Sequence, residues 1–402
     1  YILFLAGPTL GFATKGFAPL MAIAGSLAGI SILMRPKQLS QIQFGRSVLA
    51  LPFLIFIGLS LSWSQSEKGV GSYFILILVI IFTFFLQVTF QNFPPKKQIK
   101  FKQWLSASLG LGIIISLAIG SYPIIWPDLP ALTSEISNQV TLGNIELVRQ
   151  SNRSLSLAPV FLFSLAGFYW HKTRWLIVPL VLCAFIVTAI SNSQTAFLAI
   201  CMGVAAFLFT YFYKYDLKKF AFYITAIGLL ASPIVFLKSF ENSVVQNYAP
   251  EIIKHRASGE YREWIYYTYA SEALSKPLVG HGLRATQNFS PINFDKYIKL
   301  ARERAVLPAI RQGNINGNLG HAHNLPLQII FEFGYCGALL FLAAFWWILN
   351  LPFGKFNHLA SSATLAAICG LLLFSYSIWQ SWLLASLGFR YFYISTFDTL
   401  AD

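Results

Sequence analysis

Long apolar runs alternate with short polar connections along almost the whole chain. The run YFILILVIIFTFFLQV (residues 73–88) is apolar on every side, whereas a membrane β-barrel shows strand segments of about ten residues with alternating polarity. Runs of about 17 to 25 apolar residues can cross the hydrocarbon core of a bilayer as helices. The pattern therefore predicts an all-α, polytopic bundle of membrane helices.

The periodicity predicts twelve membrane segments, which are 1–13, 17–34, 47–64, 73–90, 103–120, 156–170, 175–191, 195–213, 219–239, 325–349, 359–377 and 380–397. Two connections are longer than the rest, at about 121–155 and 240–324. We accordingly expect three parts: N-terminal membrane helices (1–239), one large loop (240–324) and C-terminal membrane helices (325–402). The chain begins at Tyr1 inside an apolar run, and we expect the native N-terminus to lie upstream.

Composition supports a membrane protein. Hydrophobic residues make up 56% of the chain and charged residues only 11%, against roughly 25% charged in an ordinary soluble domain. The net charge is +14, and much of it lies in every second short loop, as the positive-inside rule requires of the cytoplasmic side. Thirteen basic residues follow this rule: Arg35, Lys37, Arg46, Lys96, Lys97, Lys100, Lys102, Lys172, Arg174, Lys214, Lys218, Lys219 and Lys355.

This charge distribution predicts that both chain ends face the cytoplasm and that the 240–324 loop faces the opposite, periplasmic side. The basic residues do not form one stripe, so the sequence does not indicate a nucleic-acid-binding protein. The four cysteines lie at unrelated spacings inside apolar runs, and we expect buried thiols rather than a disulfide framework or a zinc site.

The 240–324 loop has the composition of a folded segment. It contains four closely spaced aromatic residues and ten Lys or Arg residues, and long loops are exempt from the positive-inside rule. The basic residues therefore need another explanation, and an anionic ligand on the outer face supplies one. The four aromatic residues are Trp264, Tyr266, Tyr267 and Tyr269.

Candidate chemistry lies where this loop returns to the membrane. Asn324 precedes Leu325 and Pro326, which predicts a helix start with Asn as N-cap and Pro in the first turn. The N-terminal end of a helix favours anions, and the imidazole of His323 can act there as a general base. His323 as a plain interfacial cap is the alternative, and a metal site with His321 lacks a third ligand at recognisable spacing.

Two further polar features stand out. Arg262 opens a helical pattern that ends at Pro277, Gly280 and Gly282, a turn that includes His281; its guanidinium can grip a phosphate or remain a solvated surface charge. The second feature, SNSQT (residues 191–195), predicts a tight outer turn between two membrane helices. Polar clusters at membrane depth tend to face a cavity, although turn chemistry alone also explains this one.

Together these motifs resemble the O-antigen ligase and O-antigen polymerase superfamily. HAHNLPLQIIFEFGYCGALL (321–340) is similar to the family's H-N-x-x-L-Q-x-x-x-E-x-G-x-x-G-A helix, and Arg262 stands fifteen residues before a P-L-x-G-x-G turn. SNSQTAFLA (191–199) and SIWQSWLLAS (377–386) add to the match. The resemblance is strongest over about 190–385, whereas the first 150 residues match only in hydropathy.

The resemblance implies a type C glycosyltransferase of the bacterial inner membrane. Such an enzyme takes a glycan from undecaprenyl diphosphate on the periplasmic side and transfers it to a hydroxyl, without metal, cofactor or nucleotide sugar. The acceptor is a lipid A core sugar in ligases and a second lipid-linked repeat in polymerases. The resemblance makes His323 and Arg262 the catalytic residues. It suggests a larger set of substrate contacts: Ser193, Gln194, Arg256, His281, Arg302, Arg304, His321 and Asn324.

Two positions depart from the family pattern. Gln194 stands where many members carry a second Arg or Lys, and Tyr266 replaces the usual Trp four residues after the loop arginine. One phosphate contact is therefore missing or is supplied by Arg256, Arg302, Arg304 or Arg311. Ligase and polymerase remain alternatives, with ligase preferred. A twelve-helix secondary transporter is the competing class, but the chain shows no internal repeat and a transporter does not explain the large loop.

Overall fold

The fold is all-helical throughout the part of the chain that the structure describes. The computed structural model describes residues 2–35, 50–125, 138–191, 193–213, 217–248, 259–287, 289, 297–299, 322–350, 358–374 and 376–398. These residues form helices and turns with no strand among them. The predicted all-α class is therefore confirmed for the described residues.

The elements follow the apolar pattern of the sequence. The N-terminal half contains η1 (Ile2–Leu5), α1 (Ala6–Phe12), η2 (Thr14–Gly16), α2 (Phe17–Leu33), α3 (Leu51–Leu59), η5 (Ser60–Ser62), α4 (Gly69–Gln91), α5 (Pro95–Ile125) and α7 (Asn138–Ile190). The C-terminal half contains α8 (Gln194–Tyr213), α9 (Leu217–Glu241), α10 (Val244–Tyr248), α11 (Gly259–Ala273), η7 (Ala285–Gln287), α14 (Leu325–Leu349), α15 (His358–Phe374) and α16 (Ser381–Asp398).

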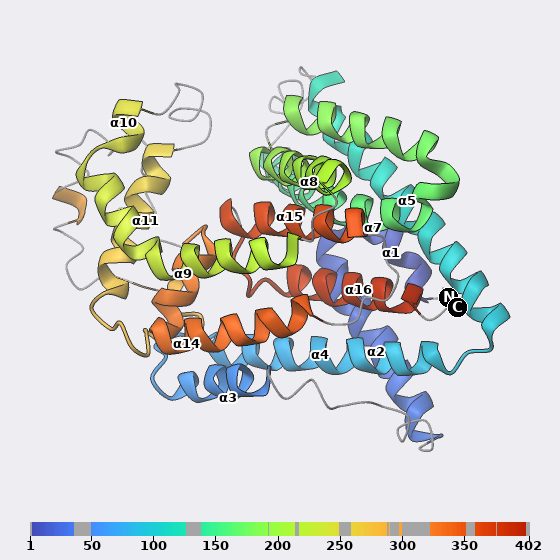
Figure 1. Ribbon diagram of the computed structural model, residues 1–402, viewed down its shortest axis with the longest axis horizontal. Helices are drawn as coiled ribbons and strands as arrows, with labels where there is room; N and C mark the ends of the chain where they lie inside the picture. The colour runs from blue at the N-terminus through green and yellow to red at the C-terminus, as the bar shows by residue number, and fades with distance from the viewer. Residues whose placement is uncertain are drawn as a thin grey trace.

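The core of the bundle surrounds the middle of α7. Residues 154–166 of this helix are all buried, and α7 packs against α5, α8 and α15. Long helices including α4, α9, α15 and α16 run side by side, while α10 and α11 gather at one end of the bundle (Figure 1). Helix α11 packs on α9 and on α14, so the described part of the large loop is folded onto the bundle.

Six helical stretches among the described residues are long and apolar enough to span a membrane. They are Thr14–Leu33, Gly69–Gln91, Pro95–Ser121, Gln194–Tyr213, Leu217–Glu241 and Leu325–Leu349. Four shorter apolar helices, Ile2–Phe12, Leu51–Ser62, Trp175–Ile190 and Leu359–Leu373, match other predicted segments. The protein is thus a multi-pass helical membrane protein by length and composition, and the number twelve stays a prediction.

Helix α7 differs from the prediction. We expected a loop over most of 121–155 and a second loop between 170 and 175, but α5 continues to Ile125 and helical backbone runs without interruption from Asn138 to Ile190. The sequence contains no proline from 138 to 158 and none in the connection HKTR (171–174). Without a proline to remove a backbone donor, polar residues alone do not end a helix.

Helix α14 also differs from the prediction of one straight helix. Gly334 has φ 61° and ψ −168°, so two helical halves, 325–333 and 335–349, meet at a kink. Figure 1 shows α14 changing direction near this point. Only glycine adopts this backbone conformation at low cost. The first half is buried along its whole length, and it carries the predicted histidine end.

Candidate functional site

The start of α14 forms as the sequence predicted. Asn324 is the N-cap, with φ −149° and ψ 115°, and its side-chain oxygen accepts a hydrogen bond of 2.9 Å from the backbone N–H of Leu327. Pro326 lies in the first turn. The Asn324 amide also donates to the carbonyl of Leu373 at 3.1 Å. Asn324 therefore fixes the end of α14 against the end of α15.

His323 stands immediately outside this cap in a conformation that is unusual for its residue type. Its φ is 50°, in the left-handed region that a non-glycine residue occupies at a cost. The hydroxyl of Tyr266 donates to the His323 carbonyl oxygen at 3.4 Å, and the side chain of His323 is half-buried. Neighbouring contacts thus hold the histidine at the N-terminal end of α14.

Arg262 lies one turn before Tyr266 on α11. The pKa of Tyr266 is raised to about 12, because the side chain is buried, while the nearby charge of Arg262 opposes this rise. Arg262 is half-buried, and no acidic group among the described residues pairs with it. Arg262 and His323 therefore both lie near the Tyr266 side chain.

The predicted turn before α8 is present in the structure. Helix α7 ends at Ile190 and α8 begins at Gln194, and the N–H of Ser193 donates to the Ser191 hydroxyl at 3.3 Å. Helices α8 and α15 pack closely where Gly370 meets the backbone of Ala199. Asn324 contacts Leu373 one turn further along α15, so α8 and α14 both contact the C-terminal half of α15.

The turn after α11 forms backbone hydrogen bonds with α14 on both sides of its kink. The N–H groups of His281 and Gly282 donate to the carbonyls of Phe331 and Glu332, at 2.9 and 2.7 Å. In the other direction, Tyr335 and Cys336 donate to Pro277 and Leu278, at 2.8 and 3.1 Å. The turn thus satisfies backbone groups that the kink leaves without helical partners, which buried backbone requires.

Gly280 and Gly334 make this close approach possible. Both have positive φ, and a Cβ atom on either one would overlap backbone atoms of the opposing segment. The P-L-x-G-x-G turn and the E-x-G part of the helix are therefore two halves of one structural unit. The sequence motifs appear separate only because Gly282 and Gly334 are 52 positions apart in the chain.

A buried polar cluster surrounds Glu332, which is fully buried. Its carboxylate accepts hydrogen bonds from Thr286 at 2.6 Å, Gln328 at 3.1 Å and Trp379 at 2.5 Å. Gln328 also donates to the Ser377 hydroxyl at 3.0 Å. Three of the sequence motifs, the glycine turn, the α14 helix and the 377–386 segment, therefore meet at one carboxylate.

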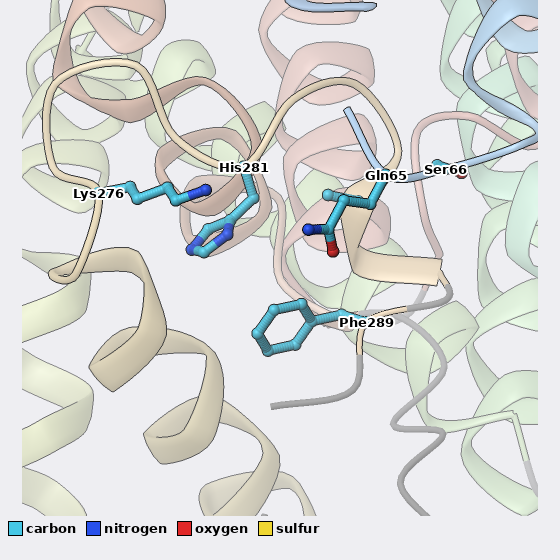
Figure 2. Close-up of a pocket in the computed structure, with 6 residues that line it drawn as sticks. Gln65, Ser66, Lys276, His281 and Phe289 are labelled. Atoms are coloured by element: carbon cyan, nitrogen blue, oxygen red, sulfur yellow. The ribbon is translucent and has the colours of Figure 1, made fainter. Parts of the chain in front are cut away.

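His281 lies behind this unit, beside a small pocket. Its ring stacks on Phe331 with centroids 4.5 Å apart, and its Nε2 lies 3.0 Å from the carbonyl oxygen of Glu272. Burial lowers the pKa of His281, and the charge of Lys276 acts in the same direction. Figure 2 shows His281, Lys276, Gln65 and Phe289 around the pocket. No described contact joins His281 to the group around His323.

The structure does not describe every predicted site residue, and it shows contacts that the sequence did not predict. Four predicted binding residues, Arg256, Arg302, Arg304 and His321, lie outside the described residues. Within the described ranges, no three His, Cys, Asp or Glu side chains gather as a metal-ligand group. Sequence reasoning missed the roles of Thr286, Trp379 and Gln65. Trp379 lies within the segment 377–386, which resembles the family pattern and could have indicated its role. The sequence around Thr286 and Gln65 contains no motif that predicts a role for either residue.

An apolar helical bundle that encloses a buried polar cluster is typical of an integral membrane protein. A family model described as O-antigen ligase matches residues 179–342, which include Gln194, Arg262 and His323. Proteins named "Putative polysaccharide ligase" from Rickettsia conorii and Rickettsia felis are 26% and 25% identical over 225 and 229 residues. These matches cover 54% of this chain in both cases, and 49% and 50% of the two relatives.

These matches support the assignment of the chain to the O-antigen ligase superfamily, as the motifs predicted. Over this part of its length the chain is similar to proteins whose printed name is polysaccharide ligase. It spans about half the length of the curated relatives that it matches. No solved structure matches it.

Proposed function

We propose that the protein transfers a glycan from undecaprenyl diphosphate to a hydroxyl acceptor on the periplasmic face of the bacterial inner membrane. The observation that carries the proposal is the meeting of the two loop motifs at the start of α14, where Tyr266 of the Arg262 helix contacts His323. A cation and an imidazole beside a helix N-terminus suit a reaction whose leaving group is an anion.

In the proposed reaction, the acceptor hydroxyl oxygen attacks the anomeric carbon of the donor sugar. The bond between that carbon and the diphosphate oxygen breaks, and the diphosphate departs with the electron pair. Arg262 contacts the diphosphate, whose negative charge grows as the bond breaks, so the contact is strongest in the transition state. His323 accepts the hydroxyl proton as general base. No metal takes part in this scheme.

We propose a ligase that uses a lipid A core sugar as the acceptor, in preference to a polymerase. The relatives' printed name, polysaccharide ligase, supports this choice. Deletion of the gene distinguishes the two activities. Polymerised chains that fail to reach lipid A indicate a ligase, whereas single lipid-linked repeats indicate a polymerase.

The direct test uses purified protein in liposomes with a lipid-linked glycan donor and a lipid A core acceptor. We expect Arg262→Ala to lower the transfer rate about 100- to 1000-fold, as loss of a transition-state charge contact does. Arg262→Lys should recover only part of the rate, because an ammonium cannot form the forked contact. Lys299→Ala, which removes an exposed charge from the same loop, is the matched control. Near-normal transfer by a folded Arg262→Ala protein would contradict the proposal.

A second set of variants tests the histidine. His323→Ala should abolish transfer without loss of folding, because the half-buried ring contributes little apolar burial. His321→Ala should have a milder effect, since the residue precedes the helix start, and a chelator should change neither protein. Equal loss at both positions with rescue by a divalent metal would replace this mechanism with a metal site.

A further inference from the structure

A second polar site lies between the 63–68 turn and the segment after α11. The pocket is lined by Gln65, Ser66, Lys276, His281, Ala285 and Phe289. Its two walls are joined by hydrogen bonds: the Ser64 hydroxyl donates to the Leu283 carbonyl at 2.7 Å, and the Leu283 N–H donates to the Ser60 hydroxyl at 3.2 Å. The pocket is therefore fixed by contacts between segments more than 200 residues apart in the sequence.

Three polar side chains that line this pocket lack a hydrogen-bond partner among the described residues. Neither the Lys276 ammonium nor the Gln65 amide has a hydrogen-bond or ion-pair partner among the described residues, and Figure 2 shows both directed toward the space beside the His281 ring. The hydroxyl of Ser66, buried in the same wall, also lacks a hydrogen-bond partner. Lys276 and Gln65 are exposed at the mouth of the pocket, and a free cation and amide beside one fixed pocket are suited to a polar, anionic ligand.

His281 adds an acceptor to this set. A carbonyl oxygen can only accept, so the Nε2 atom near the Glu272 carbonyl carries the proton. Burial and the charge of Lys276 both lower the pKa of His281, which favours the neutral ring, with Nδ1 as its acceptor. Phe289 packs against the His281 ring, with centroids 5.3 Å apart, and supplies an apolar base.

We propose that this small pocket receives the carboxylate or phosphate group of an acidic sugar residue of the transferred glycan, with the sugar ring at the pocket mouth. The carboxylate or phosphate of that sugar contacts Lys276, and its hydroxyl groups bond to Gln65 and His281. The proposal takes the glycan as the ligand from the proposed function, but the anion and hydroxyl chemistry follows from the pocket alone.

The place of the pocket indicates which part of the glycan it contacts. His281 stacks on Phe331, which lies eight residues after His323 along the first half of α14. At 1.5 Å rise per residue this is a helix length of about 12 Å. A sugar in the pocket is therefore separate from the bond that reacts near His323 and Arg262. The pocket selects the glycan and takes no part in the chemical step.

Binding can be measured without transfer, so a failure here is distinguishable from a failure of the proposed function. We would label the histidines with ¹⁵N in detergent-solubilised protein and add glucuronic acid, glucose 6-phosphate or glucose at equal ionic strength. The His281 signals should shift with one or both acidic sugars and remain unchanged with glucose. A response to glucuronic acid alone identifies a carboxylate ligand, and a response to glucose 6-phosphate alone identifies a phosphate ligand.

Substitutions then test the named contacts. Lys276→Gln should weaken binding of the acidic sugar at least tenfold, because the contact with the acidic group is lost. Gln65→Leu should weaken binding several-fold, because a hydrogen bond to a sugar hydroxyl is lost. Lys68→Gln removes an exposed lysine from the same turn as Gln65 and should leave binding unchanged. The proposal is overturned if neither acidic sugar shifts the His281 signals, if glucose shifts them equally, or if Lys276→Gln and Gln65→Leu both bind as the parent protein does.

Discussion

The hydroxyl of Tyr266 donates to the backbone carbonyl of His323 across 3.4 Å. This contact joins residues 57 positions apart and ties the Arg262 helix to the start of α14. It also acts on a residue held at φ 50°, a conformation that persists only where surrounding contacts impose it. Tyr266 is accordingly a positioning residue for the histidine that we propose as the general base.

We expect Tyr266→Phe to lower kcat for glycan transfer and to leave KM for the donor unchanged. A hydrogen bond of this kind contributes about 0.5–1.5 kcal/mol, which corresponds to a decrease of about two- to tenfold. The ring remains, including its contact with Phe236 at 4.6 Å between centroids, so the melting temperature should change little. Steady-state kinetics in liposomes provide the test, and a rise in KM at constant kcat would argue against positioning.

The Glu332 cluster should be essential for stability. Glu332→Ala leaves the buried donors of Thr286, Gln328 and Trp379 without their acceptor, and each unsatisfied group costs about 1–3 kcal/mol. We expect a large fall in melting temperature, measured by thermal unfolding in detergent, and a smaller fall for Glu332→Gln. Glu241→Ala, which breaks an exposed pair with Lys238, is the control and should have little effect. Wild-type melting of Glu332→Ala would show that the cluster contributes no stability.

Alanine substitutions at two glycines, one at the kink of α14 and one in α4, test whether the kink is required for stability. Gly334→Ala forces a side chain into a left-handed backbone conformation and into the backbone of Leu278. The strained conformation alone should cost about 1–3 kcal/mol. Gly71 lies in α4 with open space around it, so Gly71→Ala should be neutral or slightly stabilising. Similar melting temperatures for the two variants would mean that the kink is not required.

The predicted topology can be tested by labelling single cysteines in intact cells. In a background without the four native cysteines, a membrane-impermeant maleimide should label Lys299→Cys, in the large loop, and should not label Lys100→Cys. Both side chains are exposed on the protein, so accessibility differs only through the membrane. Labelling of Lys100→Cys alone would invert the topology and place the proposed site on the cytoplasmic side.

Local sequence determined which segments form helices and which residues cap the start of α14. The apolar runs specify an all-helical membrane protein because hydrocarbon leaves no other partner for backbone groups. Asn324 and Pro326 specify the start of α14 because an N-cap acts on residues within the same turn. The motif spacing around Arg262 and His323 was sufficient to predict the family that the comparisons support.

Tertiary structure decided which of these motifs share a site. No local pattern reveals that Pro277 and Leu278 accept hydrogen bonds across the kink at Gly334, or that Trp379 donates to Glu332, because the partners are dozens of residues apart. Helix α7 is continuous where two loops were expected, because no proline interrupts the polar stretches 138–155 and 171–174. Capping and hydropathy depend on near neighbours in the chain, whereas the pairing of buried polar groups depends on the fold as a whole.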